Sequence, residues 1–260
     1  MMREMIQGVF QNSVFHLVQD EPASLDLLKS GDKGPVVFES LREDRCFLSE
    51  HLDRLFRSIE LLQIKLDGSI SRKVIQEALS KTLEANTITQ PLRVKIQVTT
   101  HEFVVLIQPL DPWPESLEVI EYLYHRPHPE VKYDTDHYAK CRKEAKRLNV
   151  DELIFVDEDG FIREGSVTNV FLVIEGVLVT PKEQILRGII REEVVEKALQ
   201  KGIKVEEREV CRSEVDRADE IFVTNSLRGV VPVKGWGKWQ KKSHVVCENL
   251  VTLLGLGKSS

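Results

Sequence analysis

The stretch EVKYDTDHYAK (residues 130–140) contains two lysines, Lys132 and Lys140, and either could supply a reactive amine. An amine attacks a carbonyl group only in its neutral form, so its pKa must fall from about 10.4 through burial or neighbouring positive charge. Most lysines are solvated surface charges, so neither lysine predicts a catalytic site alone. The rest of the chain has to supply the groups that would act with such an amine.

Polar groups and glycines follow the ends of expected strands and helices elsewhere in the chain. A carboxylate in a strand end could balance a cationic ring, and the N–H groups at a helix start could bind a phosphate together with an arginine. Each feature alone also has an ordinary structural explanation, such as a turn, a helix start or an exposed ion pair. The segments are FLSEHLDRLFRS (47–58) with Arg54, REGSVTNVF (163–171) with Glu164, ILRGIIREEV (185–194) with Gly188, and DEIFVTNSLRGVVPV (219–233) with Asn225 and Ser226.

The proline-rich stretch QPLDPWPES (108–116) is the clearest break in the chain. Its closely spaced prolines cannot continue a helix or a central strand. We therefore expect a small N-terminal domain over residues 1–110 and a larger C-terminal domain over residues 111–260.

The hydrophobic periodicity predicts an α+β chain. Before the break we expect a strand in 34–43, helices over 46–64 and 71–86, and two strands within 91–110, with Ser49 as the cap of the first helix. After the break the predicted helices lie at 135–149, with Asp134 as cap, at 188–201 and near the C-terminus. Hairpins are predicted around Asp159-Gly160 and Glu175-Gly176.

Composition narrows the class of protein. The formal net charge of −6 gives no basic footprint for nucleic acid, and no run of eighteen apolar residues predicts a membrane span. The N-terminus lacks the pattern of a secretion signal, so we expect a cytoplasmic protein. The four cysteines are far apart, and we expect no metal site.

Taken together, the four segments resemble the fold-type IV pyridoxal phosphate enzymes, which include branched-chain aminotransferase, D-amino acid aminotransferase and 4-amino-4-deoxychorismate lyase. The resemblance runs from about Phe38 to Val233. It implies a two-domain fold like that of D-amino acid aminotransferase, with a C-terminal domain rich in antiparallel strands. It also implies pyridoxal 5'-phosphate as cofactor and a homodimer whose active site lies near the interface.

The resemblance also implies roles for individual residues. The family has a lysine about thirty residues before the glutamate of its Glu-Gly motif, and Lys132 lies 32 residues before Glu164. Lys132 would bond the cofactor's aldehyde and act as catalytic base, while Glu164 would keep the ring nitrogen protonated. The other implied cofactor-binding residues are Arg54, Ser166, Val167, Thr168, Gly188, Ile189, Ile190, Asn225 and Ser226.

Within the family, the runs Thr224-Asn225-Ser226 and Gly188-Ile189-Ile190-Arg191 and the short chain favour the lyase branch. That enzyme converts 4-amino-4-deoxychorismate to 4-aminobenzoate and pyruvate, a step toward folate. Two alternatives stay open: an aminotransferase for D- or branched-chain amino acids, and a non-catalytic binding or scaffold relative, suggested by the aspartates beside Lys132. The candidate substrate-binding residues are Phe38, Ser40, Arg93, Lys95 and Arg228.

Overall fold

A computed structural model describes residues 5–19, 35–44, 46–87, 89–133, 137–241, 243 and 245–254. The chain divides into two compact units. Unit 1 comprises Met1–Asp111 and Val131–Thr135, and unit 2 comprises Pro112–Glu130 and Asp136–Ser260. The first passage between the units therefore lies in the proline-rich stretch, whereas Lys132 belongs with the N-terminal unit.

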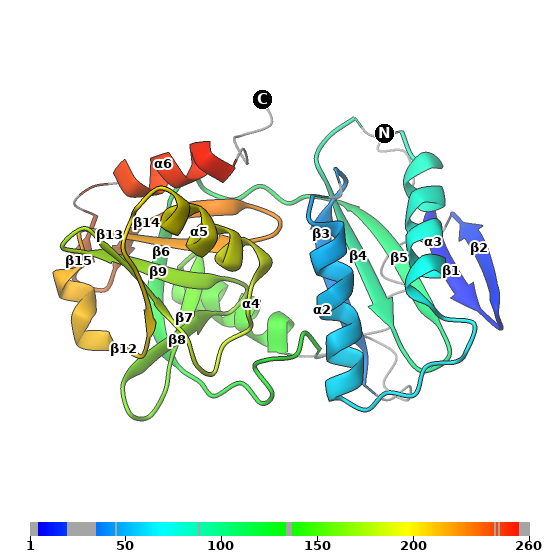
Figure 1. The fold of residues 1–260 in the computed structure, drawn as a ribbon, viewed down its shortest axis with the longest axis horizontal. Coiled ribbons are helices and arrows are strands. Elements are labelled where there is room, and N and C mark those ends of the chain that lie inside the picture. Colours follow the sequence, from blue (N-terminus) through cyan, green and yellow to red (C-terminus); the bar gives the residue numbers. More distant parts are fainter. Residues whose placement is uncertain are drawn as a thin grey trace. The chain divides into compact units, whose positions relative to one another are not determined.

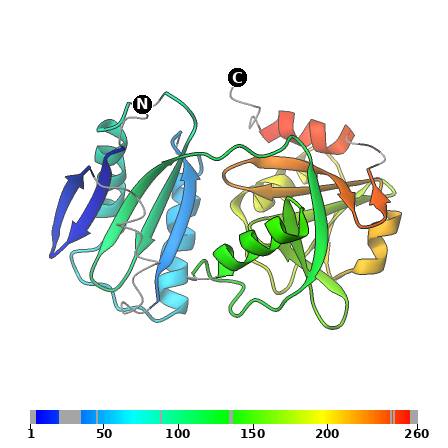
Figure 2. The same ribbon diagram turned by 180° about the vertical axis from the view of Figure 1, so that it is seen from behind.

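In the part of unit 1 that the structure describes, five strands form a sheet in the order β2-β1-β5-β4-β3. Its described pairings are antiparallel. The helices α2 and α3 cover one face of this sheet (Figures 1 and 2). The elements are β1 (Gln7–Gln11), β2 (Val14–Val18), β3 (Val37–Arg42), α2 (Leu48–Leu61), α3 (Arg72–Glu84), β4 (Leu92–Val98) and β5 (Phe103–Pro109).

The core of unit 1 lies between the sheet and the two helices. Leu52 and Leu55 of α2 and Ile75 and Leu79 of α3 are fully buried at the three- and four-residue spacings of an amphipathic helix. They pack against alternate residues of β3, β4 and β5. The predicted helices and strands of this unit are confirmed, whereas the β1–β2 hairpin was not predicted.

The start of α2 differs from the prediction. The capping position is Phe47, which has a left-handed backbone (φ 58°) and makes no side-chain cap bond. Ser49 lies inside the helix, where its carbonyl and hydroxyl accept hydrogen bonds from Arg72 at 3.0 Å. The serine is therefore used to tie α3 to α2 and not to cap α2. Asp134, the expected cap of the next helix, lies outside the described residues, as does Asp136.

The segment around Lys132 joins unit 1 along the outer edge of β3. Tyr133 forms a bridge with Val37, and the N–H of Phe38 donates to the carbonyl of Lys132 at 3.1 Å. The N–H of Lys132 donates to Ser58 of α2 at 3.4 Å. These bonds complete the edge of the sheet, so a residue that follows the proline-rich stretch in sequence is held by the N-terminal unit.

Unit 2 is built on a large mixed sheet with the described order β11-β10-β9-β13-β14-β6-β7-β8-β12, and β15 pairs with β14. Most pairs are antiparallel, but β6 runs parallel to β7 and β14, and β10 runs parallel to β11. The strands are β6 (Leu117–Leu123), β7 (Glu152–Val156), β8 (Phe161–Gly165), β9 (Asn169–Ile174), β10 (Val177–Pro181), β11 (Val205–Arg208), β12 (Val210–Cys211), β13 (Glu220–Asn225), β14 (Gly229–Trp236) and β15 (Trp239–Gln240).

Both predicted hairpins of unit 2 are confirmed. Gly160 (φ 83°) turns β7 into β8, and Glu175 and Gly176 both have positive φ between β9 and β10. Positive φ at both central residues gives the backbone twist that a two-residue hairpin needs. This pairing brings Glu164, at the end of β8, to the same region as the start of β9.

Helices lie on both sides of the sheet of unit 2. Helices α5 (Ile189–Gln200) and α6 (Val245–Leu254) pack on one side near β13, while α4 (His137–Leu148) packs against β7 on the other side (Figures 1 and 2). The turn of 3-10 helix η2 (Arg212–Arg217) follows β12. The two-domain α+β fold expected from the sequence is thereby confirmed, with the sheet of unit 2 mixed.

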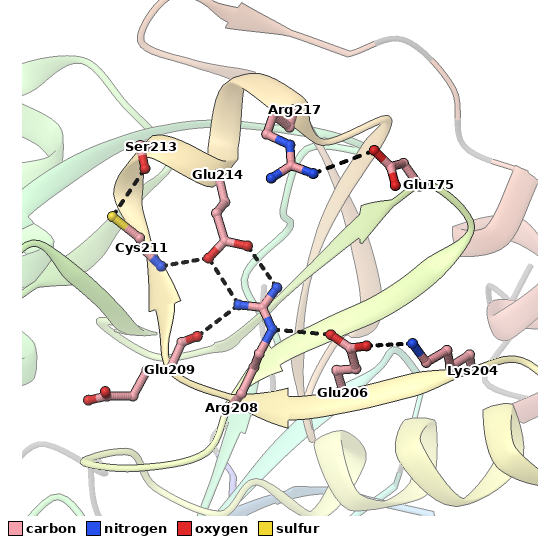
Figure 3. Close-up of polar contacts among 9 residues, drawn as sticks. All are labelled: Glu175, Lys204, Glu206, Arg208, Glu209, Cys211, Ser213, Glu214 and Arg217. Atoms are coloured by element: carbon pink, nitrogen blue, oxygen red, sulfur yellow. Dashed lines mark hydrogen bonds and ion pairs between the residues drawn. The ribbon is translucent and has the colours of Figure 1, made fainter.

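A network of charged groups links β11 to η2 (Figure 3). Arg208 donates to both carboxylate oxygens of Glu214 at 2.9 and 2.7 Å and to Glu206 at 3.2 Å, and Glu214 also accepts the N–H of Cys211 at 2.9 Å. Lys204 extends the network through Glu206 at 2.7 Å. Because most of these side chains are partly exposed, we assign the network a modest role in stability.

The buried carboxylate of Glu220 holds the start of α6. It accepts hydrogen bonds from the N–H groups of Val246 and Cys247 at 3.1 and 3.0 Å and from the hydroxyl of Ser243 at 2.9 Å. A negative charge at this end of a helix is also favoured by the helix dipole. Glu220 therefore satisfies N–H groups that have no partner within the helix.

We expect Glu220→Ala to lower the free energy of unfolding by about 2 kcal/mol, because it leaves these donors without their acceptor. Urea denaturation measures the change, and hydrogen exchange should localise it to α6. Glu248→Gln is the matched control, since Glu248 is exposed on the same helix. Equal effects of the two substitutions would contradict the assigned role of Glu220.

Among the described residues, no helix combines the length and the apolar character needed to cross a membrane.

Candidate cofactor and substrate site

Unit 1 contains a buried cluster of ionisable groups centred on Glu39 of β3. The Glu39 carboxylate accepts two bonds from Arg54 of α2, from Nε and from Nη2, both at 2.7 Å. The Nδ1 of His51 lies 2.7 Å from the same carboxylate, and the Nζ of Lys132 lies 3.9 Å from it. Glu39 is fully buried, so the cluster excludes water from its carboxylate.

Neighbouring positive charge decides the protonation state of Glu39. Burial by itself raises the pKa of the carboxyl, but the charges of Arg54 and Lys132 and the hydrogen bonds outweigh it and hold the pKa far below its ordinary value. An ionised carboxylate only accepts hydrogen bonds, so the Nδ1 of His51 carries the proton. Burial lowers the pKa of His51, which favours the neutral ring.

The opposite face of the same sheet carries four of the predicted substrate-binding residues. Ser40 stands directly opposite Lys95 in the β3–β4 register, and Phe38 stands opposite Gln97. Arg93 donates to the hydroxyl of Ser40 at 3.0 Å. The β3–β4 register places four predicted residues on this face: Phe38, Ser40, Arg93 and Lys95. Arg42, which was not predicted as a site residue, lies on the same face opposite Arg93.

Two cations lie close to the ring of Phe38: Lys95 on this face and Lys132 from the edge of the sheet. The Nζ of Lys95 lies 5.7 Å from the centre of its ring, and the Nζ of Lys132 lies 5.6 Å from it. Lys95 is 7% exposed, which is unusual for a lysine. We refer to Arg42, Arg93 and Lys95, with Phe38 and Ser40, as the cationic face.

In unit 2, the carboxylate of Glu164 accepts hydrogen bonds from a side chain and from the backbone. Its Oε1 accepts from Nη1 of Arg126 at 2.9 Å, and its Oε2 accepts from the N–H of Leu186 at 2.9 Å. Both charged side chains are less than 10% exposed. The carboxylate is therefore held in one orientation and paired with a positive charge.

The helix predicted to begin at Gly188 does begin there. Gly188 caps α5 with an extended backbone, and the first N–H groups of a helix have no partner within it. A side chain at position 188 would collide with Asn169, whose carboxamide donates to the carbonyl of Leu186 at 2.7 Å. Glycine is thus required here by the close approach of a neighbouring side chain.

Arg191 anchors this helix from inside the protein. It is 1% exposed, and its Nη2 donates to the carbonyl of Pro181 and to Glu207, both at 2.8 Å. The arginine of the Gly188-Ile189-Ile190-Arg191 run therefore fixes the helix to β10 and β11. The backbone N–H groups of Ile189 and Ile190 are the part of this run that can face a ligand.

The turn after β13 is held by Asn225. Its Oδ1 accepts from the N–H groups of Leu227 and Arg228 at 3.1 and 2.9 Å. The hydroxyl of Thr224, at the end of the strand, is buried and makes no hydrogen bond with the described residues. Thr224 pairs with Asn169 across the strands, which places this hydroxyl near the start of α5.

The turn after Glu164 is organised by Glu152 of β7. This buried carboxylate accepts from the hydroxyl and N–H of Ser166, from the N–H of Val167 at 3.3 Å and from the hydroxyl of Thr168 at 3.2 Å. Burial raises the pKa of Glu152 despite these donors. The hydroxyls of Ser166 and Thr168 thus serve the turn, and the exposed Val167 is the part of it that faces outward.

The family model for amino-transferase class IV matches residues 37–236 of the chain. The chain belongs to this family. A Methanocaldococcus jannaschii protein assigned as a branched-chain-amino-acid aminotransferase is 30% identical over 229 residues, covering 77% of this chain and 78% of that protein.

Solved structures show the same fold for this class IV enzyme. A Thermotoga maritima protein assigned as a branched-chain amino acid aminotransferase superposes with a TM-score of 0.78 at 29% identity, covering 95% of this chain and 94% of that one. A Legionella pneumophila protein assigned as a 4-amino-4-deoxychorismate lyase gives a TM-score of 0.74 at 20% identity, covering 86% of this chain and 91% of that one. The second likeness concerns the fold alone.

Class IV aminotransferases depend on pyridoxal phosphate, which is the cofactor of this enzyme. The residues present fit it. In unit 2, the start of α5 and the buried Thr224 hydroxyl offer donors for a phosphate, and Glu164 offers a fixed negative charge. In unit 1, Arg54 and Lys132 offer a guanidinium and an amine.

Arg54 and Lys132 thus belong to unit 1, and Glu164 and the start of α5 belong to unit 2. The roles assigned to Lys132, Arg54 and Glu164 stay predictions. Sequence reasoning missed the residues that hold the site in place, because each acts through a partner distant in the chain. These residues are Glu39, Arg126, Glu152 and Arg191.

Proposed function

We propose that this class IV enzyme is a lyase that converts 4-amino-4-deoxychorismate to 4-aminobenzoate and pyruvate. The cationic face is the observation that carries the proposal. Arg42, Arg93 and Lys95 lie on the same side of the sheet of unit 1 as Phe38, and Lys95 lies over its ring. The proposed substrate has two carboxylates, one on its six-membered ring and one on its enolpyruvyl group, which suits a face that carries several cations and an aromatic side chain.

A substrate with an aliphatic side chain fits this face less well. Such a side chain offers no negative charge to the cations of the face. Two arginines can bind carboxylates in a planar, two-bonded geometry, and Lys95 adds a point charge. The arrangement therefore favours an acidic substrate over leucine, isoleucine or valine.

Lys132 would move the protons of the reaction. The cofactor supplies an electron-withdrawing ring that stabilises negative charge at the carbon bearing the substrate's amino group. The Lys132 Nζ would take the proton from that carbon and return a proton to the departing enolpyruvyl group, which leaves as pyruvate. Arg54 would bind the cofactor's phosphate and Glu164 its ring nitrogen, while the cationic face would hold the substrate's carboxylates.

The sequence runs at the phosphate-binding turns support the same branch. Thr224-Asn225-Ser226 and Gly188-Ile189-Ile190 differ from the glycine- and threonine-rich runs that the resemblance implies for aminotransferases. Asn225 uses its side chain to close its own turn, so the turn does not depend on a glycine at that position.

The second candidate is an aminotransferase, and it is favoured by a different observation. The relatives with the higher identities are assigned as branched-chain aminotransferases. An aminotransferase also accepts 2-oxoglutarate, whose two carboxylates could use the same cationic face. For either activity we propose a homodimer, which the family resemblance implies.

We expect the purified enzyme, supplied with 4-amino-4-deoxychorismate and no keto acid, to release pyruvate and 4-aminobenzoate in equal amounts. A coupled lactate dehydrogenase assay measures pyruvate, and chromatography measures the aromatic product. Lys95→Met should reduce kcat/KM by about tenfold or more, because it removes a buried charge from the binding face. The control is Lys140→Met, since Lys140 is exposed on α4.

Sustained formation of glutamate from 2-oxoglutarate and an amino donor, without pyruvate release from 4-amino-4-deoxychorismate, would replace the lyase assignment by the aminotransferase. A protein that stays colourless when pyridoxal phosphate is added would instead indicate the non-catalytic relative.

A further inference from the structure

The cluster around Glu39 leads to a role that the proposed reaction does not itself use. We propose that Glu39 is a positioning residue: it fixes the guanidinium of Arg54 so that Arg54 can bind the cofactor's phosphate group. The inference rests on the proposed phosphate-binding role of Arg54. It concerns cofactor binding and is independent of whether the enzyme eliminates pyruvate or transfers an amino group.

The geometry of the Glu39–Arg54 pair supports this role. The pair is side-on and two-bonded, using Nε and Nη2 of Arg54. A guanidinium held in this way cannot rotate about its long axis without breaking two charge-assisted hydrogen bonds. The Glu39 carboxylate therefore sets the plane of Arg54 and the direction in which Nη1 points.

The rest of the cluster keeps Glu39 itself in place. His51, one helical turn before Arg54 on α2, binds the carboxylate through Nδ1 at 2.7 Å. Both side chains are 0–1% exposed, so water does not compete for these bonds. The carboxylate is thus held by two residues of α2 and by the β3 backbone that carries it.

Burial also argues that this carboxylate is kept for a reason other than stability. An ion pair taken out of water often contributes no more stability than well-packed apolar side chains of the same size. On β3, Glu39 lies on the same face as Val37 and Leu41, which are fully buried and apolar. A carboxylate in this row is explained by the arginine that it orients.

The electrostatic effect of Glu39 on the phosphate is opposite in sign to its positioning effect. A negative charge next to Arg54 weakens the general attraction of the site for a dianion. If Glu39 acted only through its charge, Glu39→Gln would tighten the binding of pyridoxal phosphate. If Glu39 positions Arg54, the same substitution weakens it, since Arg54 must then be immobilised at the moment of binding.

The test compares pyridoxal phosphate with pyridoxal, which lacks the phosphate. Kd values for both are measured by absorbance titration of the full chain for wild type, Glu39→Gln and Glu39→Asp. Effects on Lys132, whose Nζ lies 3.9 Å from Glu39, act on both ligands and cancel in the ratio of the two Kd values. The phosphorus-31 NMR signal of the bound cofactor reports the phosphate environment directly.

We expect Glu39→Gln to weaken pyridoxal phosphate binding by about tenfold relative to pyridoxal. Glu39→Asp keeps the buried charge and shortens the side chain by one methylene, so it should fold and show a loss of the same kind. In an Arg54→Gln background, Glu39→Gln should leave the ratio unchanged. Asp53→Asn is the matched control, because Asp53 is exposed on the same helix and pairs with Arg72.

An equal loss for both ligands would overturn the proposal and indicate a purely structural role for Glu39. A gain in pyridoxal phosphate affinity, or an unchanged ratio in both Glu39 variants, would also overturn it. Failure of the lyase assay would not affect this result, because the readout is the binding of two cofactor forms and not turnover.

Discussion

Lys132→Ala is expected to abolish covalent attachment of the cofactor and to lower kcat by at least about 10³-fold. The substitution removes both the amine that bonds the cofactor and the group that moves the substrate proton. Reduction with borohydride followed by mass spectrometry of the peptides checks the attachment. In the wild type the added mass should lie on the peptide that contains Lys132.

Lys140→Ala is the matched control, since Lys140 lies eight residues further on and is exposed on α4. It should retain both the covalent modification and the activity. A modification found on Lys140, or one that persists in Lys132→Ala, would refute the assignment of Lys132. Lys132 and Lys140 also differ in the structure. The backbone of Lys132 is hydrogen-bonded to unit 1 and its side chain is partly buried, whereas Lys140 is exposed.

Glu164→Gln is expected to reduce kcat by about 100-fold and the free energy of unfolding by about 3 kcal/mol. The loss of activity follows from removing the negative charge that the cofactor's ring nitrogen needs. The loss of stability follows from the Arg126 pair, because removing one partner leaves a buried charge uncompensated. Steady-state kinetics and urea denaturation measure the two quantities separately.

The double variant Glu164→Gln/Arg126→Gln separates the two effects. Replacing both partners should restore part of the stability, since no buried charge is then left alone, while activity stays low. Glu158→Gln, exposed at the tip of the β7–β8 hairpin, is the control. Recovery of activity in the double variant would show that Glu164 acts only on stability and not on the cofactor.

The organisation of unit 2 explains why its predicted cofactor-binding residues have different roles. The start of α5 presents the backbone groups of Gly188, Ile189 and Ile190. Arg191 holds this helix start to β10 through its bond to the carbonyl of Pro181. The side chains of Ser166 and Asn225 are used to shape turns. We expect a phosphate at such a place to be bound mainly through the backbone, with the side chains determining where the backbone lies.

Much of the local structure follows from the sequence itself. The spacing of Leu52, Leu55 and Ile59 determined α2, and Asp159-Gly160 and Glu175-Gly176 determined two hairpins, since these patterns act over a few residues. The order and spacing of Lys132, Glu164 and Gly188 also carried the resemblance that led to the family. Local periodicity and turn chemistry suffice for such features because no distant partner is needed.

Only the tertiary structure decided how these residues are held. Glu39 meets Arg54 and His51 because β3 packs on α2, and Arg126 meets Glu164 although 38 residues separate them. The cationic face exists because the β3–β4 register turns Ser40, Arg93 and Lys95 to the same side. Charged side chains look alike in a sequence, and burial and a partner in space are what distinguish a fixed group from a solvated one.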